Sequence, residues 1–367
     1  MSVLIALGSF KGSVRSTTAC SIVYRSLLRR TKSSEVAVLP LADGGEGTLE
    51  VFEHYFGGSM AVHVAHDCMG RRRRCRVWTN ASGFALIESA EVVGHSLVGR
   101  ADRDPWAASS RGVAELINEL VADGFRVIAV SMGDSAVMDF GVGMLAELGV
   151  RFYRNHVRID HPRLAHLATI SGFDARVLSE LWPGVTIFGL VDTYDFVCGE
   201  DGQGEQYGHQ KGLVPSDSEF LEACYSNFTS LIEEELGVAV GRLPFGGGSG
   251  GLGGALAAFL GADLVHTPEY LDNYLGISRR IAEYSHVVTG EGQLDRQTKW
   301  GKVPYYVASR VSSDARFTAL VGSSTIEGSA DLLRVAPQAQ IVELHVPEPY
   351  TGTRNALSRV ASGLTNG

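Results

Sequence analysis

The sequence has little of what secreted, disulfide-bonded and membrane-spanning proteins require. Its 367 residues include only five cysteines, which are odd in number and scattered, so they do not form the pattern of a disulfide framework. No stretch reaches the roughly 18 apolar residues of a membrane-spanning helix. The apolar run Val3–Leu7 is too short for the core of a signal peptide. We therefore expect a cytoplasmic protein without a membrane partner.

An excess of basic residues is also missing. The chain carries 32 Lys and Arg residues against 41 Asp and Glu residues, a formal net charge of -9, whereas nucleic acids are bound by a basic surplus. One short basic run, Arg71–Arg74, follows a predicted turn. We interpret it as the solvated edge of a hairpin, with anion binding as the alternative. No nucleic-acid partner is expected.

Strand patterns alternate with helical ones along most of the chain. Apolar residues make up 45% of the composition, and at about 100–200 residues per domain the length predicts two domains. Buried strands are expected at Val3–Leu7, Glu35–Leu39, Val127–Val130, Thr186–Asp192, His286–Gly292, Arg316–Ser324 and Gln340–Leu344. Helical spacing covers Ser16–Leu28 and Gly112–Gly124. Such alternation predicts mostly parallel α/β sheets.

One segment departs from this alternation. From Met60 to Ser89, apolar and polar residues alternate with period two around two predicted turns, which indicates antiparallel strands. The predicted fold class is therefore α/β, with two α/β domains and a cleft between them. Residues 1–60 plus 262–367 are expected to form a Rossmann-like domain with a mostly parallel sheet. Residues 61–261 are expected to form a mixed, β-richer α/β domain.

Six predicted strands are followed by glycines, hydroxyl side chains, lysines and carboxylates. In open α/β sheets, ligands bind outside the carboxyl ends of the strands. Each segment alone is more typical of a turn or a helix start, but six together favour a ligand site. Lys11 and Lys302 add positive charge there. The carboxylates suited to Mg²⁺ or to proton transfer are Asp43, Glu46, Asp139, Asp192, Glu291 and Asp295. This combination is typical of phosphoryl transfer, which depends on positioning and charge neutralisation.

A glycine-rich run lies between Arg242 and Ala262. Seven of the nine residues from Gly246 to Gly254 are glycine, and an Ala- and Leu-rich helical pattern follows at once. No Gly-Lys-Ser/Thr closes the run, so it is not a Walker A loop, and its G-x-G-x-x-G matches are accidental in so glycine-rich a segment. Two interpretations stay open: a backbone anion site at a helix N-terminus, and a linker or close helix packing.

Taken together, these segments resemble the bacterial glycerate kinase family. "ALGSFKGSV" is similar to the family's "APDSFKGSL", "ADGGEGT" is identical, and "TGEGQLDRQTKWGKVP" follows its "TGEGxxDxQTxxGKxP". "RDPWAASSRGVAELI", "YGHQKG" (Tyr207–Gly212) and "LPFGGGSGGLGGAL" are similar to "RDPxxTTSxGTGELI", "FGPQKG" and "xPGAGAAGGxGxAL". The matches are collinear and cover nearly the whole chain.

The resemblance implies a kinase that phosphorylates D-glycerate with ATP and Mg²⁺, at an active site between two α/β domains. Its partners would be ATP and a small-molecule substrate, and a homodimer is compatible with it. The implied catalytic residues are Lys11, Asp192, Asp295 and Lys302, of which Asp192 or Asp295 would accept the hydroxyl proton or bind Mg²⁺. The expected substrate- and phosphate-binding residues are Ser9, Asp43, Gly44, Gly45, Glu46, Lys211, Gly247, Gly248, Ser249, Gly250, Gly251, Glu291 and Gln297.

The sequence departs from the family pattern at several strand ends. The departures are Gly8 (acidic in the family), Asp134 and Phe140 (glycines), Val137 (threonine) and Asp195, which replaces the asparagine of "DVTNPL" in "DTYDFV". A buried phenylalanine and added carboxylates are expected to reshape the pocket and to disfavour an anionic acceptor. Two alternatives follow: a kinase of another small polyol, cyclitol or hydroxy compound in a biosynthetic pathway, and a catalytically silent binding protein.

Overall fold

The computed structural model describes residues 2–29, 32, 35–199, 202–346 and 352–364. The contacts divide the chain into two compact units, unit 1 (Met1–Tyr55 with His266–Gly367) and unit 2 (Phe56–Val265). The boundaries predicted near residues 60 and 262 lie close to these limits, and the independence of the two units as domains stays a prediction. Along the described ranges, no helix is long and apolar enough to cross a membrane.

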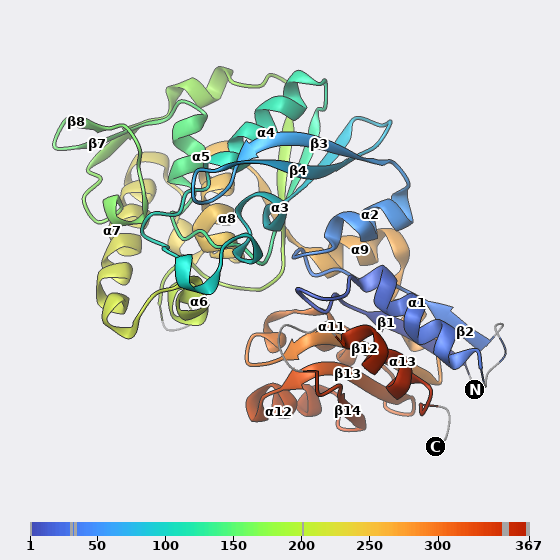
Figure 1. Ribbon diagram of the computed structural model, residues 1–367. Helices are drawn as coiled ribbons and strands as arrows, with labels where there is room; N and C mark the ends of the chain where they lie inside the picture. Colours follow the sequence, from blue (N-terminus) through green and yellow to red (C-terminus); the bar gives the residue numbers. More distant parts are fainter. Residues whose placement is uncertain (1, 30–31, 33–34, 200–201, 347–351, 365–367) are drawn as a thin grey trace. The chain divides into compact units, whose positions relative to one another are not determined.

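Unit 1 contains a five-stranded sheet in the order β14-β13-β12-β1-β2 (Figure 1). Every neighbouring pair is parallel, as predicted. The five residues of β1 are all buried, as expected of a parallel strand that is covered on both faces. The strands are β1 (Val3–Leu7), β2 (Val36–Val38), β12 (His286–Leu294), β13 (Arg316–Ser324) and β14 (Ala339–Glu343).

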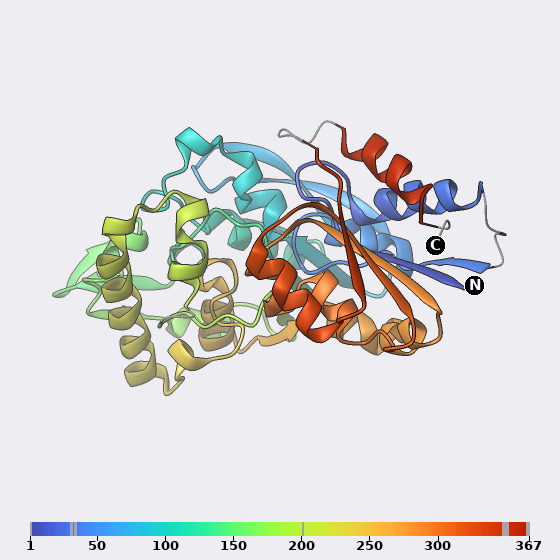
Figure 2. The ribbon, with the colours of Figure 1, turned by 90° about the horizontal axis from the view of Figure 1, so that it is seen from below.

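Helices cover both faces of this sheet (Figure 2). On one face lie α1 (Ser16–Leu27) and α13 (Thr353–Ala361). Their Val23 and Leu357 join Ile5 of β1 in a hydrophobic core. On the opposite face lie α11 (Val303–Ala308) and α12 (Ile326–Val335). Unit 1 also contains α2 (Thr48–Phe56), α9 (Thr267–Leu275), α10 (Ile277–Ala282) and the 3-10 helix η8 (Thr298–Trp300).

Unit 2 contains a six-stranded mixed sheet in the order β11-β10-β6-β5-β4-β3. β5, β6 and β10 are parallel, whereas β3, β4 and β5 pair antiparallel, which confirms the prediction for Met60–Ser89. Arg71, Arg72 and Arg74 are exposed at the turn between β3 and β4, as a solvated hairpin edge requires. The strands are β3 (Ser59–His66), β4 (Arg72–Thr79), β5 (Phe84–Glu88), β6 (Val127–Met132), β10 (Thr186–Val191) and β11 (Asp263–His266).

A second, three-stranded antiparallel sheet of unit 2 was not predicted. It consists of β7 (Arg151–Arg154), β8 (Val157–Ile159) and β9 (Gly172–Asp174). Strands of three or four residues are too short to show a period in the sequence. The helices of unit 2 are α3 (Ser89–Val93), α4 (Arg111–Ala122), α5 (Val142–Glu147), α6 (Gln203–Lys211), α7 (Ser218–Leu236) and α8 (Gly248–Leu260), with 3-10 helices at His95–Leu97, Arg100–Asp102, Leu164–His166, Arg176–Glu180, Pro215–Asp217 and Val240–Arg242.

Candidate functional site

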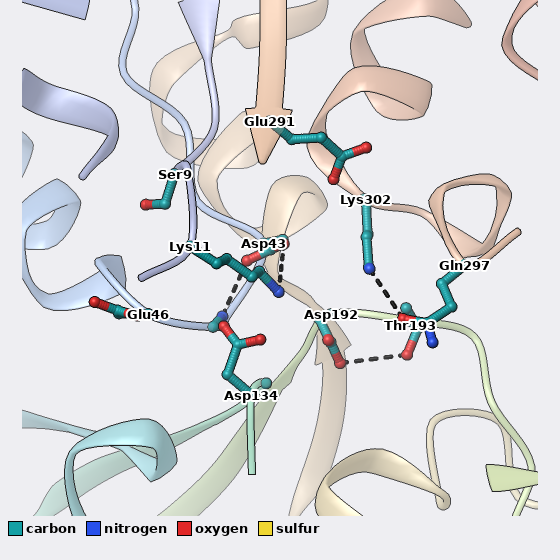
Figure 3. A network of polar contacts seen from close by, with 12 residues as sticks. Ser9, Lys11, Asp43, Glu46, Asp134, Asp192, Thr193, Glu291, Gln297 and Lys302 are labelled. Atoms are coloured by element: carbon teal, nitrogen blue, oxygen red, sulfur yellow. Dashed lines mark hydrogen bonds and ion pairs between the residues drawn. The ribbon is translucent and has the colours of Figure 1, made fainter. Parts of the chain in front are cut away.

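In unit 1, the predicted site residues follow three adjacent parallel strands. β12, β1 and β2 are neighbours in the sheet, so their carboxyl ends lie at one edge, where α/β sheets bind ligands. Figure 3 shows side chains from all three strand ends. The loop after β1 carries Ser9 and Lys11, the loop after β2 carries Asp43 to Glu46, and β12 with its following loop carries Glu291, Asp295, Gln297 and Lys302.

An ion pair joins the loops after β1 and β2. Lys11 Nζ lies 3.6 Å from Asp43 Oδ2 (Figure 3). The other carboxylate oxygen of Asp43 accepts a hydrogen bond of 3.0 Å from the backbone N–H of Gly45. Asp43 therefore serves as the turn-forming residue that a lone "ADGG" suggests, and also as a partner of Lys11. The Glu46 carboxylate makes a second link, because it accepts from Gly12 N at 3.3 Å.

Gly47 allows a close approach at the same edge. Its φ is 100°, and a Cβ atom there would lie 2.5 Å from the Ser9 hydroxyl oxygen. A side chain at this position would therefore displace Ser9. The Ser9 hydroxyl accepts from the backbone N–H of Ser16, the first residue of α1, at 3.3 Å. Ser9 thus lies where a helix begins.

The segment after β12 forms a compact polar network. Lys302 Nζ donates to Gln297 Oε1 at 3.1 Å (Figure 3) and lies 3.9 Å from Asp295 Oδ1. Asp295 also accepts from the backbone N–H of Gln297 at 2.9 Å. Glu291 is buried and accepts from the Thr298 hydroxyl at 2.8 Å. Burial raises the pKa of Glu291 to about 7, although Lys302 and Thr298 oppose this shift. This carboxyl group is therefore poised to gain or lose a proton near neutral pH.

In unit 2, β6 is followed by a loop that we call the β6 loop (Gly133–Phe140). Lys211 of α6 is buried, and its ammonium donates to Val137 O at 2.9 Å and to the Ser135 hydroxyl at 3.2 Å. Burial lowers the pKa of Lys211 to about 8, although nearby aspartates oppose this shift. Lys211, which we expected to bind substrate or phosphate, therefore donates to oxygen atoms of the protein's own β6 loop.

Two of the departures from the family pattern occupy left-handed backbone in this loop. Asp134 has a φ of 58° and Phe140 a φ of 51°, a region that glycine adopts without cost. The glycines of the family pattern at these positions thus have a conformational reason. Phe140 is fully buried and packs against Phe228 and Tyr225 at ring-centroid distances of 5.1 and 6.2 Å. Phe140 is therefore buried, as expected, and its side chain fills the hydrophobic core, whereas its effect on a ligand pocket stays a prediction.

The segment after β10, which we call the β10 loop (Asp192–Val197), carries two buried carboxylates. Thr193 Oγ1 donates to Asp195 Oδ2 at 2.6 Å and lies 3.3 Å from Asp192 Oδ1 (Figure 3). Tyr207 of α6 in turn donates its hydroxyl proton to Thr193 Oγ1 at 3.1 Å. The structure thus brings Asp192 and Asp195 together around one hydroxyl group.

The glycine-rich run is not a flexible linker. Ser249, Gly250 and Gly251 have φ values of 51°, 73° and 88° inside α8, so the regular right-handed helix begins only after them. A Cβ atom on Gly250 would lie 2.1 Å from Val137 O, and one on Gly247 would lie 2.5 Å from Phe196 O. Close backbone packing on the β6 and β10 loops therefore explains these glycines, and their binding of phosphate stays a prediction.

Sequence reasoning missed several buried polar residues at the ends of β5 and β6. Glu88, Ser89 and Ser131 are fully buried. The Ser89 hydroxyl lies 3.2 Å from Gly133 O and 3.3 Å from Ser249 Oγ. The signal was present in "FALIESA", where a buried strand pattern ends in an acidic residue and a serine.

Asp139 has a structural role at the end of the β6 loop. It is buried and accepts from Ser110 N and Ser110 Oγ at 2.9 Å, Gly143 N at 3.1 Å and Gly141 N at 3.2 Å. Burial raises the pKa of Asp139, and these donors oppose the shift. The carboxylate joins the starts of α4 and α5, which leaves it no capacity for a metal ion. Within the described ranges, no group of three or more His, Cys, Asp and Glu residues is placed to hold a metal ion.

Gly8, where the family pattern is acidic, lies against the start of α11. A Cβ atom on Gly8 would lie 3.2 Å from Val303 Cβ and 3.3 Å from Gly290 O. An acidic side chain here would require Val303 to shift by a few tenths of an ångström. The absence of a side chain at this strand end thus fits the valine opposite it.

Comparison with known proteins gives one consistent result. The sequence model of the family described as "Glycerate kinase family" matches residues 3–362 of this chain. The glycerate kinase of Halalkalibacterium halodurans is 30% identical over 83% of this chain and 81% of its own length. The glycerate 2-kinase of Escherichia coli is 30% identical over 84% and 81%. A solved Salmonella typhimurium LT2 structure, assigned as glycerate kinase 2, covers 100% of this chain and 96% of its own at 30% identity with a TM-score of 0.75. The chain therefore belongs to the glycerate kinase family, whose members are ATP-using phosphotransferases with an alcohol group as acceptor.

Proposed function

We propose that this protein transfers the γ-phosphoryl group of ATP to a hydroxyl group of D-glycerate. The observation that carries the proposal is the placement of Lys11 and Lys302 after adjacent parallel strands of unit 1, in a chain that matches the family over residues 3–362. Phosphoryl transfer needs positive groups that neutralise the developing charge and hold the reacting oxygens in line. Two lysines at one sheet edge meet that need.

The other predicted site residues have supporting roles in this proposal. Ser9, Gly44, Gly45 and Gln297 supply neutral donors and close backbone approach at the edge of the unit 1 sheet. Asp43 and Glu46 fix the loops that carry Lys11 and Gly12. In unit 2, the segment Gly247–Gly251 shapes the ends of β6 and β10 by its packing.

We propose that Asp192 or Asp295 accepts the hydroxyl proton or binds Mg²⁺. Mg²⁺ binds proteins through one or two carboxylates and keeps water molecules and substrate phosphates as its other ligands, so the lack of a larger acidic cluster in the described part of the chain agrees with it. When bound, the ion would neutralise phosphate charge.

A second candidate function is phosphorylation of a neutral polyol or cyclitol. Asp134 and Asp195 favour it, because both add a carboxylate beside Asp192 at neighbouring strand ends where the family pattern has none. Like charges disfavour an acceptor that carries its own carboxylate. A catalytically silent binding protein is the third alternative. The homodimer and the cytoplasmic location stay predictions.

The experiment is a measurement of ADP release with ATP, Mg²⁺ and a panel of acceptors. D-glycerate, other sugar acids, polyols and cyclitols are each tested with the wild type and with Lys302→Ala and Asp295→Ala. We expect D-glycerate to stimulate ADP release, and each variant to lower kcat/KM by about 100-fold or more. A neutral acceptor that outperforms glycerate would favour the second candidate. ATP binding without turnover on any acceptor would overturn the kinase proposal in favour of the silent protein.

A further inference from the structure

One face of helix α6 contacts both loops that carry the unit 2 site residues. Tyr207 and Lys211 are four residues apart, so they lie on the same side of the helix. Lys211 Nζ donates to Ser135 Oγ and Val137 O of the β6 loop at 3.2 and 2.9 Å. Tyr207 donates to Thr193 Oγ1 of the β10 loop at 3.1 Å. A single rigid element thus sets the spacing of two strand-end loops.

A second set of hydrogen bonds closes a ring between α6 and the β6 loop. The backbone N–H and the Nδ1 atom of His95 both contact Asp134 O, at 2.9 and 2.7 Å. Arg103 donates to His95 O at 3.1 Å and to Gln210 O, next to Lys211, at 2.7 Å. The C-terminal end of α6 is therefore tied to the β6 loop through Lys211 on one side and through Arg103 and His95 on the other.

The remaining backbone of the β6 loop is also fixed. Tyr225 donates to Met138 O at 3.0 Å, and Phe140 N donates to Gly250 O at 3.0 Å. Ala136 N donates to Val93 O at 2.7 Å. This many external contacts can hold the left-handed conformation of Asp134 and Phe140, which would otherwise relax. Strained backbone that its surroundings over-determine is typical of functional sites.

We propose that α6 is a positioning helix, which acts through Tyr207 and Lys211 to hold the β10 and β6 loops in the arrangement that phosphoryl transfer needs. Neither side chain is a ligand of ATP or of the acceptor in this proposal. It rests on the proposed kinase function and replaces the expectation that Lys211 binds substrate or phosphate. Lys211 is 5% exposed, and the two oxygens that its ammonium contacts belong to one loop of the protein itself.

Three departures from the family pattern meet at the Tyr207 end of this face. In "YGHQKG" a tyrosine stands where the family pattern has phenylalanine, and in "DTYDFV" Thr193 and Asp195 replace valine and asparagine. Two consecutive hydrogen bonds join all three residues: the Tyr207 hydroxyl donates to Thr193 Oγ1, and Thr193 Oγ1 donates to Asp195 Oδ2. Phenylalanine and valine cannot form these bonds. The three side chains thus add a polar link between α6 and the β10 loop.

The first test is amide hydrogen exchange of the full-length protein, which does not depend on activity. Lys211→Met is expected to speed exchange in the β6 loop by about tenfold, and Tyr207→Phe in the β10 loop by about fivefold, because each loses hydrogen bonds that hold that loop. The matched control is His209→Ala, whose side chain is exposed on the same helix. The proposal would be overturned if Lys211→Met exchanged no faster than this control in the β6 loop, or if Tyr207→Phe exchanged no faster than this control in the β10 loop.

The second test separates positioning from ligand binding. With ATP and D-glycerate, Lys211→Met is expected to lower kcat by about tenfold or more with KM values changed less than about threefold, because misplaced loops impair the reaction without removing a ligand contact. A KM that rises tenfold at unchanged kcat would identify Lys211 as a ligand and overturn the proposal. If the wild type is inactive on every acceptor, the kinase function fails, and the exchange measurement alone decides whether α6 positions the loops.

Discussion

The Thr298 hydroxyl donates a hydrogen bond of 2.8 Å to Oε1 of Glu291, a carboxyl group that is 6% exposed at the end of a central parallel strand. One donor and the charges of Lys302 and Lys11 do not offset the burial, which raises the pKa of Glu291 to about 7. This pKa makes the stability of the protein depend on pH.

We expect Glu291→Gln to be more stable than the wild type above pH 7. The native pKa of about 7 exceeds the ordinary value of 4.5, so between these values the native state binds more protons than the unfolded state. Proton binding by native Glu291 therefore stabilises the protein fully below pH 4.5, and this stabilisation is lost as the pH rises through 7. The glutamine side chain carries no titrating proton, so Glu291→Gln avoids this loss, which amounts to about 3 kcal/mol in the wild type at pH 8. Urea denaturation of both proteins at pH 5 and pH 8 measures it.

Thr298→Val is the matched control for this prediction. It removes the hydroxyl that stabilises the ionised carboxylate, so the native pKa of Glu291 is expected to rise further. The loss of stability still begins near the ordinary value of 4.5, but it continues to higher pH than in the wild type and is larger at pH 8. An equal pH dependence of the free energy of unfolding in the wild type and in Glu291→Gln would contradict the assigned pKa.

Lys211 is expected to act in the opposite direction. Its native pKa of about 8 lies below the ordinary value of 10.5, so between pH 8 and 10.5 the unfolded state binds more protons. The free energy of unfolding therefore rises with pH in this window, relative to a protein without Lys211. We expect the free energy of unfolding of the wild type, minus that of Lys211→Met, to rise by about 2–3 kcal/mol from pH 7 to pH 10. Denaturation at both pH values measures this difference, and a constant value would show that Lys211 is not desolvated.

The two left-handed departures in the β6 loop should respond differently to restoration of glycine. Phe140→Gly relieves backbone strain but empties a core position beside Phe228, so we expect a loss of about 2–4 kcal/mol. Asp134→Gly relieves similar strain without such a loss, and we expect a change of less than about 1 kcal/mol. Thermal or urea denaturation distinguishes the two, and a stabilised Phe140→Gly would contradict the core assignment.

Much of this architecture is readable from local patterns, because the long strands are locally consistent. Val3–Leu7 and Arg316–Ser324 have the bounds that their apolar runs predict. The burial of Phe140 was expected, but its packing partners could not be predicted, since only the tertiary structure brings Phe228 and Tyr225 against it. The Tyr207–Thr193–Asp195 chain was hidden for the same reason, as its members lie 12 or more residues apart along the sequence except for Thr193 and Asp195.

The glycine-rich run provides the last prediction, because two of its positive-φ glycines differ only in their surroundings. Gly250 has a φ of 73° and faces Val137 O, 2.1 Å from where a Cβ atom would stand, whereas Gly261 has a φ of 64° and faces open space. Alanine at either position carries the left-handed strain of about 1 kcal/mol. Only Gly250→Ala must also move Val137, whose carbonyl oxygen Lys211 holds.

We therefore expect Gly261→Ala to lower the free energy of unfolding by about 1 kcal/mol and to leave kcat unchanged. Gly250→Ala should cost at least twice as much and lower kcat by about tenfold or more, since it displaces the β6 loop. Urea denaturation and ADP release measure both variants. Equal effects of the two substitutions would mean that glycine is needed at position 250 only for its left-handed backbone conformation and not for the close contact with Val137 O. A larger effect of Gly250→Ala would link the run to the loop that Lys211 holds, whether or not its amides also bind phosphate.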